Sequence, residues 1–284
     1  MRRINSKHII VILAAAIIIV TAAIVYRLIS IQAEDASSAK EYNSYKGGDY
    51  YSADMNLLNI VEEVPDDVTD VGVAGEDVSY KAQREIWKGT NFNAFKNTNS
   101  DFIGIISIPF LKMWYPMVQN KEDSYDHYLS YSFNGDKNAN GTIFLDYTFS
   151  NDFSDNHAIV FGHNMKNLSM FGSLHTLFDS EYKKPIYVYI YQPNQILVYE
   201  VFAAYTTPAE SSTYNAFLVN SEHYESYISE AIQSAVYKHS DKNVTQGRKD
   251  QKSILTLSTC HANDHSDYTV VQCMLIERIG KDEE

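Results

Sequence analysis

Two residues of this chain could form the reactive part of an enzyme, Cys260 and His163. Cys260 follows the alternating apolar run Ile254–Leu257, which predicts a β-strand that holds the cysteine at a rigid edge. A cysteine attacks as its thiolate, so a thiol with an ordinary pKa of about 8.5 needs a base or a positive neighbour. His163 is the best local candidate for the base, because it ends the apolar run Ala158–Phe161 beside a glycine. The pattern indicates a cysteine nucleophile with a histidine partner.

Other roles for these residue types stay open. His163 could be a structural histidine, and His261 and His265 are interpreted as loop residues. With Cys260 and Cys273 these two could form a metal set, but the spacing matches no common zinc pattern, so we expect no metal and no cofactor. Cys273 lies in a β-branched run and is interpreted as a buried apolar residue, with a disulfide to Cys260 as the alternative.

Short β-rich runs separated by turn signals dominate the chain after Asp101. Eight of them are predicted as strands, at 102–108, 114–119, 141–147, 157–163, 185–191, 196–207, 253–259 and 268–279. Helices are expected at 80–97, 168–179 and 221–239, the last with Ser221 as its N-cap. Many short strands with few helices between them predict a mostly β domain that closes into a barrel.

The N-terminal region is predicted to anchor the chain in a membrane. Residues 9–29 carry Arg27 as their only charge and are long enough to span a bilayer. Basic residues within 1–8 place that end in the cytoplasm and the rest of the chain outside the cell. A signal peptide cleaved after Ala33 is the alternative. Residues 30–79 are interpreted as an acidic stalk with a short helix at 55–61, and residues 80–284 as the catalytic domain with an N-terminal helical extension.

The charge of the chain excludes one class of partner. The formal net charge is -13, and residues 34–77 hold twelve acidic residues against two lysines. Nucleic-acid binding needs a basic face for the phosphates, so we expect no nucleic-acid partner. The ectodomain shows no obvious interface helix and is expected to be monomeric.

Several stretches together resemble a class B sortase, a cell-wall cysteine transpeptidase of Gram-positive bacteria. Thr256–Cys260, which reads TLSTC, resembles the family's cysteine motif, and Phe161–Leu174 resembles its histidine motif. The strand motifs are similar too, at 101–109, 115–119 and 141–147. The resemblance covers about 87–280. It implies an eight-stranded sortase-type β-barrel with an N-terminal helix, an extra helix before the cysteine strand and a single N-terminal transmembrane helix.

The resemblance also implies a reaction. Cys260 would attack the carbonyl after a threonine in the C-terminal sorting signal of a secreted protein and form a thioacyl-enzyme. His163 would act first as an acid and then as a base. An amine of peptidoglycan or of its lipid-linked precursor would then accept the protein. The expected sorting signals are of the Asn-Pro-x-Thr or Pro-x-Thr-Gly type. The resemblance also implies that the chain is a thiol protease of the cysteine hydrolase class. Its expected location is the cell membrane, with the catalytic domain facing the cell wall.

Four further residues are expected near the substrate. Thr259 and Ser258 immediately precede the cysteine, and Tyr214 and Phe217 lie in the loop 207–218. Together with the helix at 221–239, this loop is the expected wall of a binding groove.

One position departs from the family. Sortases carry an arginine before an aromatic-Val-Val strand, and its fixed cationic fork donates to the oxyanion. Here Tyr268, eight residues after Cys260, stands in that place. Tyr268 could donate its phenolic O–H, or Arg248 or Lys249 could fold back as a substitute. In the third alternative, catalysis is impaired and the domain binds sorting signals or partners. An L,D-transpeptidase is disfavoured, because the cysteine follows Leu-Ser-Thr and not the Ser-His-Gly of that family.

Overall fold

The computed structural model describes residues 6–52, 74–121, 127–179, 182, 184–214, 218, 220–260 and 267–280. The chain divides into two compact units, Met1–Asn43 and Ser44–Glu284. The described residues of the first unit belong to one helix, α1 (Ser6–Ser44), whose large apolar side chains from Leu13 to Ile31 are exposed. By length and composition α1 could cross a membrane. The predicted membrane segment 9–29 therefore lies within one continuous helix, which runs on through part of the predicted stalk.

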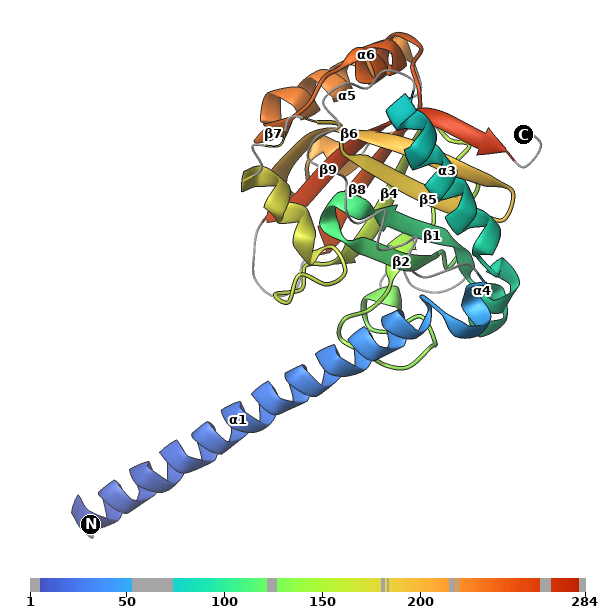
Figure 1. Cartoon of the computed structure of the whole chain (residues 1–284). Coiled ribbons are helices and arrows are strands. Elements are labelled where there is room, and N and C mark those ends of the chain that lie inside the picture. The colour runs from blue at the N-terminus through green and yellow to red at the C-terminus, as the bar shows by residue number, and fades with distance from the viewer. Residues whose placement is uncertain are drawn as a thin grey trace. The chain divides into compact units, whose positions relative to one another are not determined.

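The second unit is built on a single sheet of short strands (Figure 1). The strands are β1 (Phe102–Ile108), β2 (Met113–Val118), β3 (Ile143–Leu145), β4 (His157–His163), β5 (Tyr187–Gln192), β6 (Gln195–Pro208), β7 (Tyr237–Lys238), β8 (Ile254–Cys260) and β9 (Asp267–Gly280). Side chains on both faces are buried along β1 and β4, as their continuous apolar sequences require. The eight runs predicted as strands all form strands.

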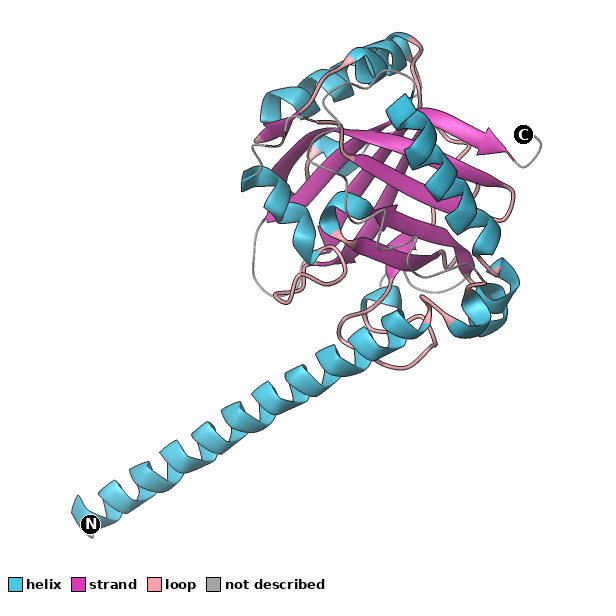
Figure 2. Ribbon diagram, in the orientation of Figure 1, coloured by secondary structure: helices cyan, strands magenta, loops and turns pink. Residues whose placement is uncertain are grey.

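The sheet closes on itself. Its order is β5-β1-β2-β3-β4-β8-β9-β6-β7, and an additional pairing of β5 with β6 joins the two sides. The two-residue strand β7 adds to β6 outside this ring, so eight strands form the barrel. Most pairs are antiparallel, but two are parallel, β2 with β3 and β4 with β8. The β4–β8 pairing runs from His157 beside Ile254 to His163 beside Cys260. The predicted eight-stranded barrel is confirmed, with the helices at its periphery (Figure 2).

Aromatic residues tie the segment before the barrel to its side. Tyr45 packs on Phe95 and Phe133, and the Tyr51 hydroxyl donates to the Ile86 carbonyl. The helices of this region are η1 (Gly48–Tyr50), α3 (Ala74–Gly89) and α4 (Phe92–Thr98). Residues 45–52 of the predicted stalk are therefore packed on the domain, because burial of their tyrosines outweighs the acidic character of the region. The short helix predicted at 55–61 lies outside the described residues.

The helix predicted at 221–239 is shorter in the structure, and a second helix follows it before the cysteine strand. α5 (Ser221–Ser234) is capped by Asn220, whose side chain accepts from the His223 N–H, so Ser221 is the first helical residue and the predicted N-cap was wrong. The chain then forms β7 and a second helix, α6 (Lys242–Lys249), capped by Asp241. The buried face of α5 packs on β6, β8 and β9.

The helix predicted at 168–179 was wrong in type and extent. A 3₁₀-helix, η4, occupies Gly172–Asp179, and the residues before it form turns. Leu168 and Met170 have φ values of 65° and 50°, which no right-handed helix can include. Three further 3₁₀-helices complete the fold, η2 (Pro109–Leu111), η3 (His127–Leu129) and η5 (Ser212–Tyr214).

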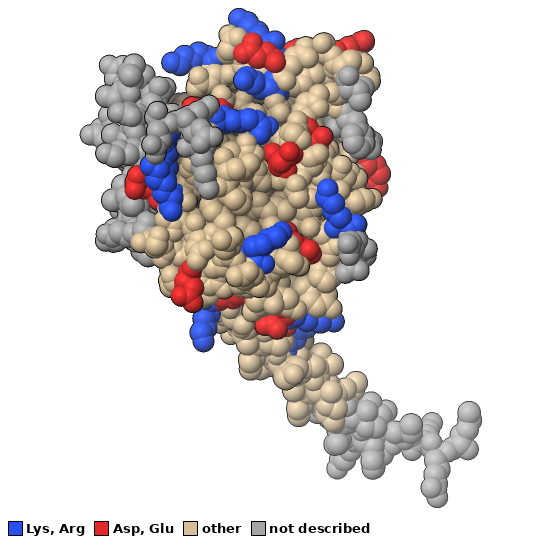
Figure 3. Space-filling model, turned by 90° about the vertical axis from the view of Figure 1, so that its right-hand side faces the viewer, with Lys and Arg blue, Asp and Glu red and all other residues tan. Residues whose placement is uncertain are grey.

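The surface charges are mixed on the face that Figure 3 shows. Lysine and arginine side chains lie interspersed with aspartate and glutamate, and uncharged surface separates them.

Candidate active site

His163 and Cys260 end two neighbouring parallel strands. They are register partners, the last pair of the β4–β8 ladder. Gly162, just before the histidine, is required by packing: a Cβ there would lie 2.4 Å from Ile143 Cδ1 and 2.9 Å from the Phe171 ring. Two neighbouring strands thus place the two candidate reactive residues at the same level at one end of the barrel.

The His163 ring is buried and held through one nitrogen. Its exposed fraction is 8%, and Nε2 lies 2.7 Å from the Leu129 carbonyl oxygen. A carbonyl oxygen can only accept, so Nε2 carries the proton of the neutral ring and Nδ1 keeps its lone pair. Nδ1 is buried and has no hydrogen-bond partner in the described part of the chain. The ring is therefore oriented as an acceptor through Nδ1, a state suited to proton transfer.

Burial also sets the protonation state of this histidine. Desolvation lowers the pKa of His163 from its ordinary 6.5, and the bond to the Leu129 carbonyl opposes that shift only in part. The loop that brings Leu129 close passes through Gly141, which has a φ of 60° and whose missing Cβ would meet the Tyr128 carbonyl oxygen at 2.4 Å. Because desolvation lowers the pKa of His163, its neutral imidazole is the resting form near pH 7.

The end of β8 meets a cluster of polar and aromatic side chains. The Tyr214 hydroxyl lies 2.8 Å from Ser258 Oγ, and its ring contacts Tyr268 edge-on with centroids 5.7 Å apart. The Thr259 hydroxyl accepts from the Thr269 backbone N–H at 2.9 Å. The structure thus brings four of the predicted site residues together beside the end of the cysteine strand. Phe217 and the Cys260 side chain lie outside what the structure describes.

Tyr268 lies at the level of the cysteine on the next strand. The β8–β9 pairing ends with Ser258 beside Val270, and two residues further along each strand lie Cys260 and Tyr268. The Tyr268 side chain is half-buried. The strand that contains Tyr268 therefore starts beside Cys260.

The predicted substitutes for the family arginine lie elsewhere. Arg248 is on α6 and donates to the Glu225 carboxylate from Nε at 2.8 Å. Its neighbour Gly247 packs against Met274, the register partner of Ile254 at the start of β8. Six residues of strand, about 20 Å, separate that level from Cys260. Arg248 and the adjacent Lys249 are therefore remote from the candidate site.

Sequence reasoning missed a buried hydrogen-bond network beneath the site. The Tyr227 hydroxyl lies 3.0 Å from Thr256 Oγ1 and accepts from Gln272 at 2.8 Å, and His157 Nε2 lies 2.7 Å from Thr256 Oγ1. Gln272 also donates to the Tyr205 hydroxyl. The alternation of polar residues with leucine in the cysteine strand was the available signal. The network ties α5 to β4, β8 and β9.

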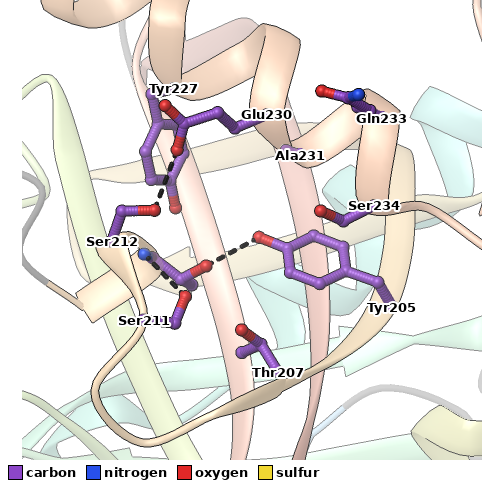
Figure 4. A pocket seen from close by; sticks show the side chains of 10 residues that line it. Tyr205, Thr207, Ser211, Ser212, Tyr227, Glu230, Ala231, Gln233 and Ser234 are labelled. Atoms are coloured by element: carbon purple, nitrogen blue, oxygen red, sulfur yellow. Dashed lines mark hydrogen bonds between the residues drawn. The ribbon is translucent and has the colours of Figure 1, made fainter.

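A pocket of about 150 Å³ opens beside this network (Figure 4). Residues of both expected groove walls line it, including Ser212 from the loop and Glu230 from α5, whose side chains are joined by a 2.8 Å hydrogen bond. Tyr205 and Thr213 also line the pocket, and their hydroxyl groups lie 3.0 Å apart. The lining is polar, with hydroxyl groups that could contact a peptide.

The second cysteine is inert by position. Cys273 is a free thiol on β9, fully buried, so the disulfide to Cys260 is not formed. Burial raises the pKa of the Cys273 thiol far above its ordinary value. The prediction that Cys273 is a buried apolar residue is confirmed. His261 and His265, the other members of the metal set considered above, lie outside the described residues.

The family model for the sortase domain matches residues 106–276. This match spans more than half of the 284 residues, and the chain belongs to the sortase family.

Individual relatives refine the class. Sortase B of Listeria monocytogenes is 33% identical over 164 residues, which cover 57% of this chain and 63%, less than two thirds, of that relative. The structure of Clostridium perfringens sortase B has a TM-score of 0.57 at 27% identity, over 66% of this chain and all of that one. A Staphylococcus aureus sortase B–substrate complex shares the fold, with a TM-score of 0.63 at 20% identity over 86% of this chain and 98% of that one. The chain is a class B member, as its motifs predicted.

Proposed function

We propose that this chain is a cysteine transpeptidase, which cleaves a sorting signal after its threonine and joins the secreted protein to a peptidoglycan amine. The register pairing of His163 with Cys260 at the ends of β4 and β8 supports this proposal most directly. The solved Staphylococcus aureus relative is a substrate complex, and a signal of the Asn-Pro-x-Thr or Pro-x-Thr-Gly type is the corresponding substrate here.

The first half of the reaction forms a thioacyl-enzyme. Cys260 Sγ bonds to the carbonyl carbon of the threonine. The thiol proton moves to Nδ1 of His163, the ring nitrogen without a hydrogen-bond partner among the described residues. The tetrahedral oxyanion collapses, the C–N bond breaks, and the imidazolium returns the proton to the leaving amine. Because burial keeps His163 neutral, the proton transfer accompanies attack and no stable thiolate–imidazolium pair is needed beforehand.

The second half transfers the acyl group. An amine of the peptidoglycan peptide or its lipid-linked precursor enters from the side that the first leaving group vacated. His163, neutral again, accepts a proton as the amine attacks the thioester, and Cys260 leaves and is reprotonated. The pocket between η5 and α5 would offer hydroxyl groups to one of the two peptides.

Tyr268→Phe should lower kcat about 10²-fold with KM little changed, because it removes one neutral donor to the oxyanion and leaves the ring contact with Tyr214 in place. Initial rates on a fluorogenic sorting peptide would measure this in the full-length chain in detergent. Tyr50→Phe is the matched control, since that half-buried hydroxyl bonds Thr98 elsewhere. Wild-type turnover by Tyr268→Phe would show that another group stabilises the oxyanion.

A second candidate function follows from Tyr268, which stands where the family has an arginine. A neutral tyrosine in the place of an arginine favours a domain that binds sorting signals or partners without efficient turnover. The two functions differ in the outcome of Tyr268→Arg. A weak wild-type enzyme that becomes faster with arginine supports the impaired module, whereas a competent wild-type enzyme excludes it.

The proposed location follows from α1. Its exposed apolar surface suits a single membrane span, and the basic residues before it favour an N-terminus in the cytoplasm with the barrel on the wall side. There the enzyme meets both secreted proteins and peptidoglycan precursors.

One experiment tests the proposed chemistry directly. The full-length chain is mixed with a sorting peptide and quenched in acid, and the intact mass is recorded. We expect an adduct equal to the peptide's acyl part, removable by hydroxylamine as a thioester is, and mapped to the peptide that contains Cys260. Peptide binding with no acyl adduct at any time would contradict the proposal.

A further inference from the structure

Far from the candidate active site, three potential metal ligands converge beside the helical excursion. They are Glu200 on β6, His239 just after β7, and Asp241, the N-cap of α6. One ligand atom from each lies within 4.8 Å of the others. Glu200 is the register partner of Met274, and Met274 pairs with Ile254 at the start of β8. The cluster is therefore about 20 Å along the sheet from Cys260.

Local backbone structure explains how the three residues meet. β7 pairs with β6 through Lys238 beside Ala203, and the His239 N–H then donates to the Phe202 carbonyl. Because β7 runs antiparallel to β6, each residue after Lys238 lies closer to Glu200, and His239 reaches it. Asp241 caps α6 by accepting from the N–H groups of Asn243 and Val244 through Oδ1, which leaves its other oxygen for the cluster.

The polar atoms at this point lack the hydrogen bonds that burial demands. Glu200 is completely buried, and its Oε1 has no hydrogen-bond partner among the described residues. The same is true of His239 Nε2, which lies 3.4 Å from Glu200 Oε1, and of the Tyr237 hydroxyl. Glu200 Oε2 accepts a long hydrogen bond of 3.4 Å from the Asn243 side-chain amide. Buried polar atoms left this way are costly unless another partner satisfies them.

We propose that Glu200, His239 and Asp241 bind a divalent transition-metal cation of the zinc type. In a tetrahedral zinc site, with bonds of about 2.0–2.2 Å, neighbouring ligand atoms are about 3.3–3.6 Å apart. The 3.4 Å between Glu200 Oε1 and His239 Nε2 matches that spacing, although it fails as a hydrogen bond. One imidazole with two carboxylates suits zinc, and water would complete the four positions.

The electrostatics of the cluster agree with a bound cation. The carboxyl groups of Glu200 and Asp241 lie close together, with no lysine or arginine paired to either among the described ion pairs. A divalent ion would supply the missing positive charge. His239 retains 14% exposure of its side chain, so the site has an entry from solvent.

The role of this ion would be structural. It would join β6, the residues after β7 and the start of α6, and so fasten the excursion that contains α5 to the barrel wall. Because Asp241 is both the helix cap and a ligand, the ion and α6 would stabilise each other.

The test is zinc binding by the full-length chain in detergent micelles, stripped with EDTA and then given ZnCl₂. We expect one zinc per chain after dialysis, measured by mass spectrometry of the metal, and a melting temperature about 5–10 °C higher when free zinc is about 100-fold above Kd. Calcium and magnesium should produce no such shift, because hard cations disfavour an imidazole ligand.

Variants assign the binding to this cluster. His239→Ala and Glu200→Gln should lose both the bound zinc and the zinc-dependent shift. His223→Ala, which removes an exposed histidine of α5, should keep them. Glu200→Gln is nearly isosteric, so its metal-free melting temperature should match the metal-free wild type and show that it folds. Absence of zinc from the wild type, or equal zinc in His239→Ala and His223→Ala, would overturn the proposal.

Discussion

Cys260→Ala should abolish turnover of a sorting peptide, with a loss of at least about 10⁴-fold in kcat. Alanine offers no nucleophile, so the thioacyl intermediate cannot form. The substitution lies at the end of β8, whose preceding residues are fixed by pairing with both β4 and β9, so the fold should be retained. Fluorogenic peptide cleavage by the full-length chain measures the loss.

The chain supplies its own control for this prediction. Cys273→Ala removes the only other cysteine, a fully buried thiol that takes no part in the proposed chemistry. It should keep turnover near that of wild type, at a modest cost in stability from the lost sulfur contacts. Cleavage that survives in Cys260→Ala, or that disappears in a folded Cys273→Ala, would mean that the nucleophile has been misassigned.

Much of the barrel could be predicted because its strands carry a strong local signal. The strands at 102–108 and 157–163 were placed with their observed ends, since both are continuous apolar runs bounded by a change in polarity. Their pairing could not be predicted from the residues alone. The parallel ladder that sets His163 beside Cys260 depends on contacts between positions almost a hundred residues apart.

The elements that were missed have weak local signals. β7 contains two residues and exists only because it pairs with β6. α6 is a short, polar helix with an internal glycine, and its stability comes from the Asp241 cap and its contact with β9. The Glu200–His239 contact depends on both, so the candidate metal cluster has no signature in the linear sequence.

The candidate site was predictable in its residues but not in its hydrogen bonds. His163 stands out because a glycine precedes it at a strand end, and the family motif points to the same residue. The partner that fixes its tautomer, the Leu129 carbonyl, lies in a loop thirty-four positions earlier, and a backbone carbonyl leaves no trace in residue type. The environment that lowers the pKa of His163 therefore emerges only in the folded chain.

His163→Gln should lower kcat by about 10²–10⁴-fold, because glutamine can still bond the Leu129 carbonyl but cannot accept and return a proton. Binding of the peptide should be nearly unchanged. The exposed His223→Gln is the matched control and should leave kcat unaltered. Rates with a peptide that carries an activated leaving group should be less impaired, since such a group needs little protonation. Equal impairment with both peptides would argue against an acid role.

The direction of the His163 pKa shift also predicts how activity and stability of the wild type depend on pH, and how His163→Gln should change that dependence. Burial disfavours the imidazolium, so the pKa of folded His163 lies below 6.5 and the acid limb of kcat/KM should fall below pH 6.5. The unfolded chain binds the proton more readily. The contribution of His163 to the free energy of unfolding is therefore fully present above pH 6.5 and is lost as the pH falls toward the pKa of the folded state. His163→Gln should weaken this decline in melting temperature, and His223→Gln should not. An acid limb above pH 6.5 in the wild type would show that His163 is stabilised as a cation, because an ion pair with the Cys260 thiolate would then outweigh the burial of the ring.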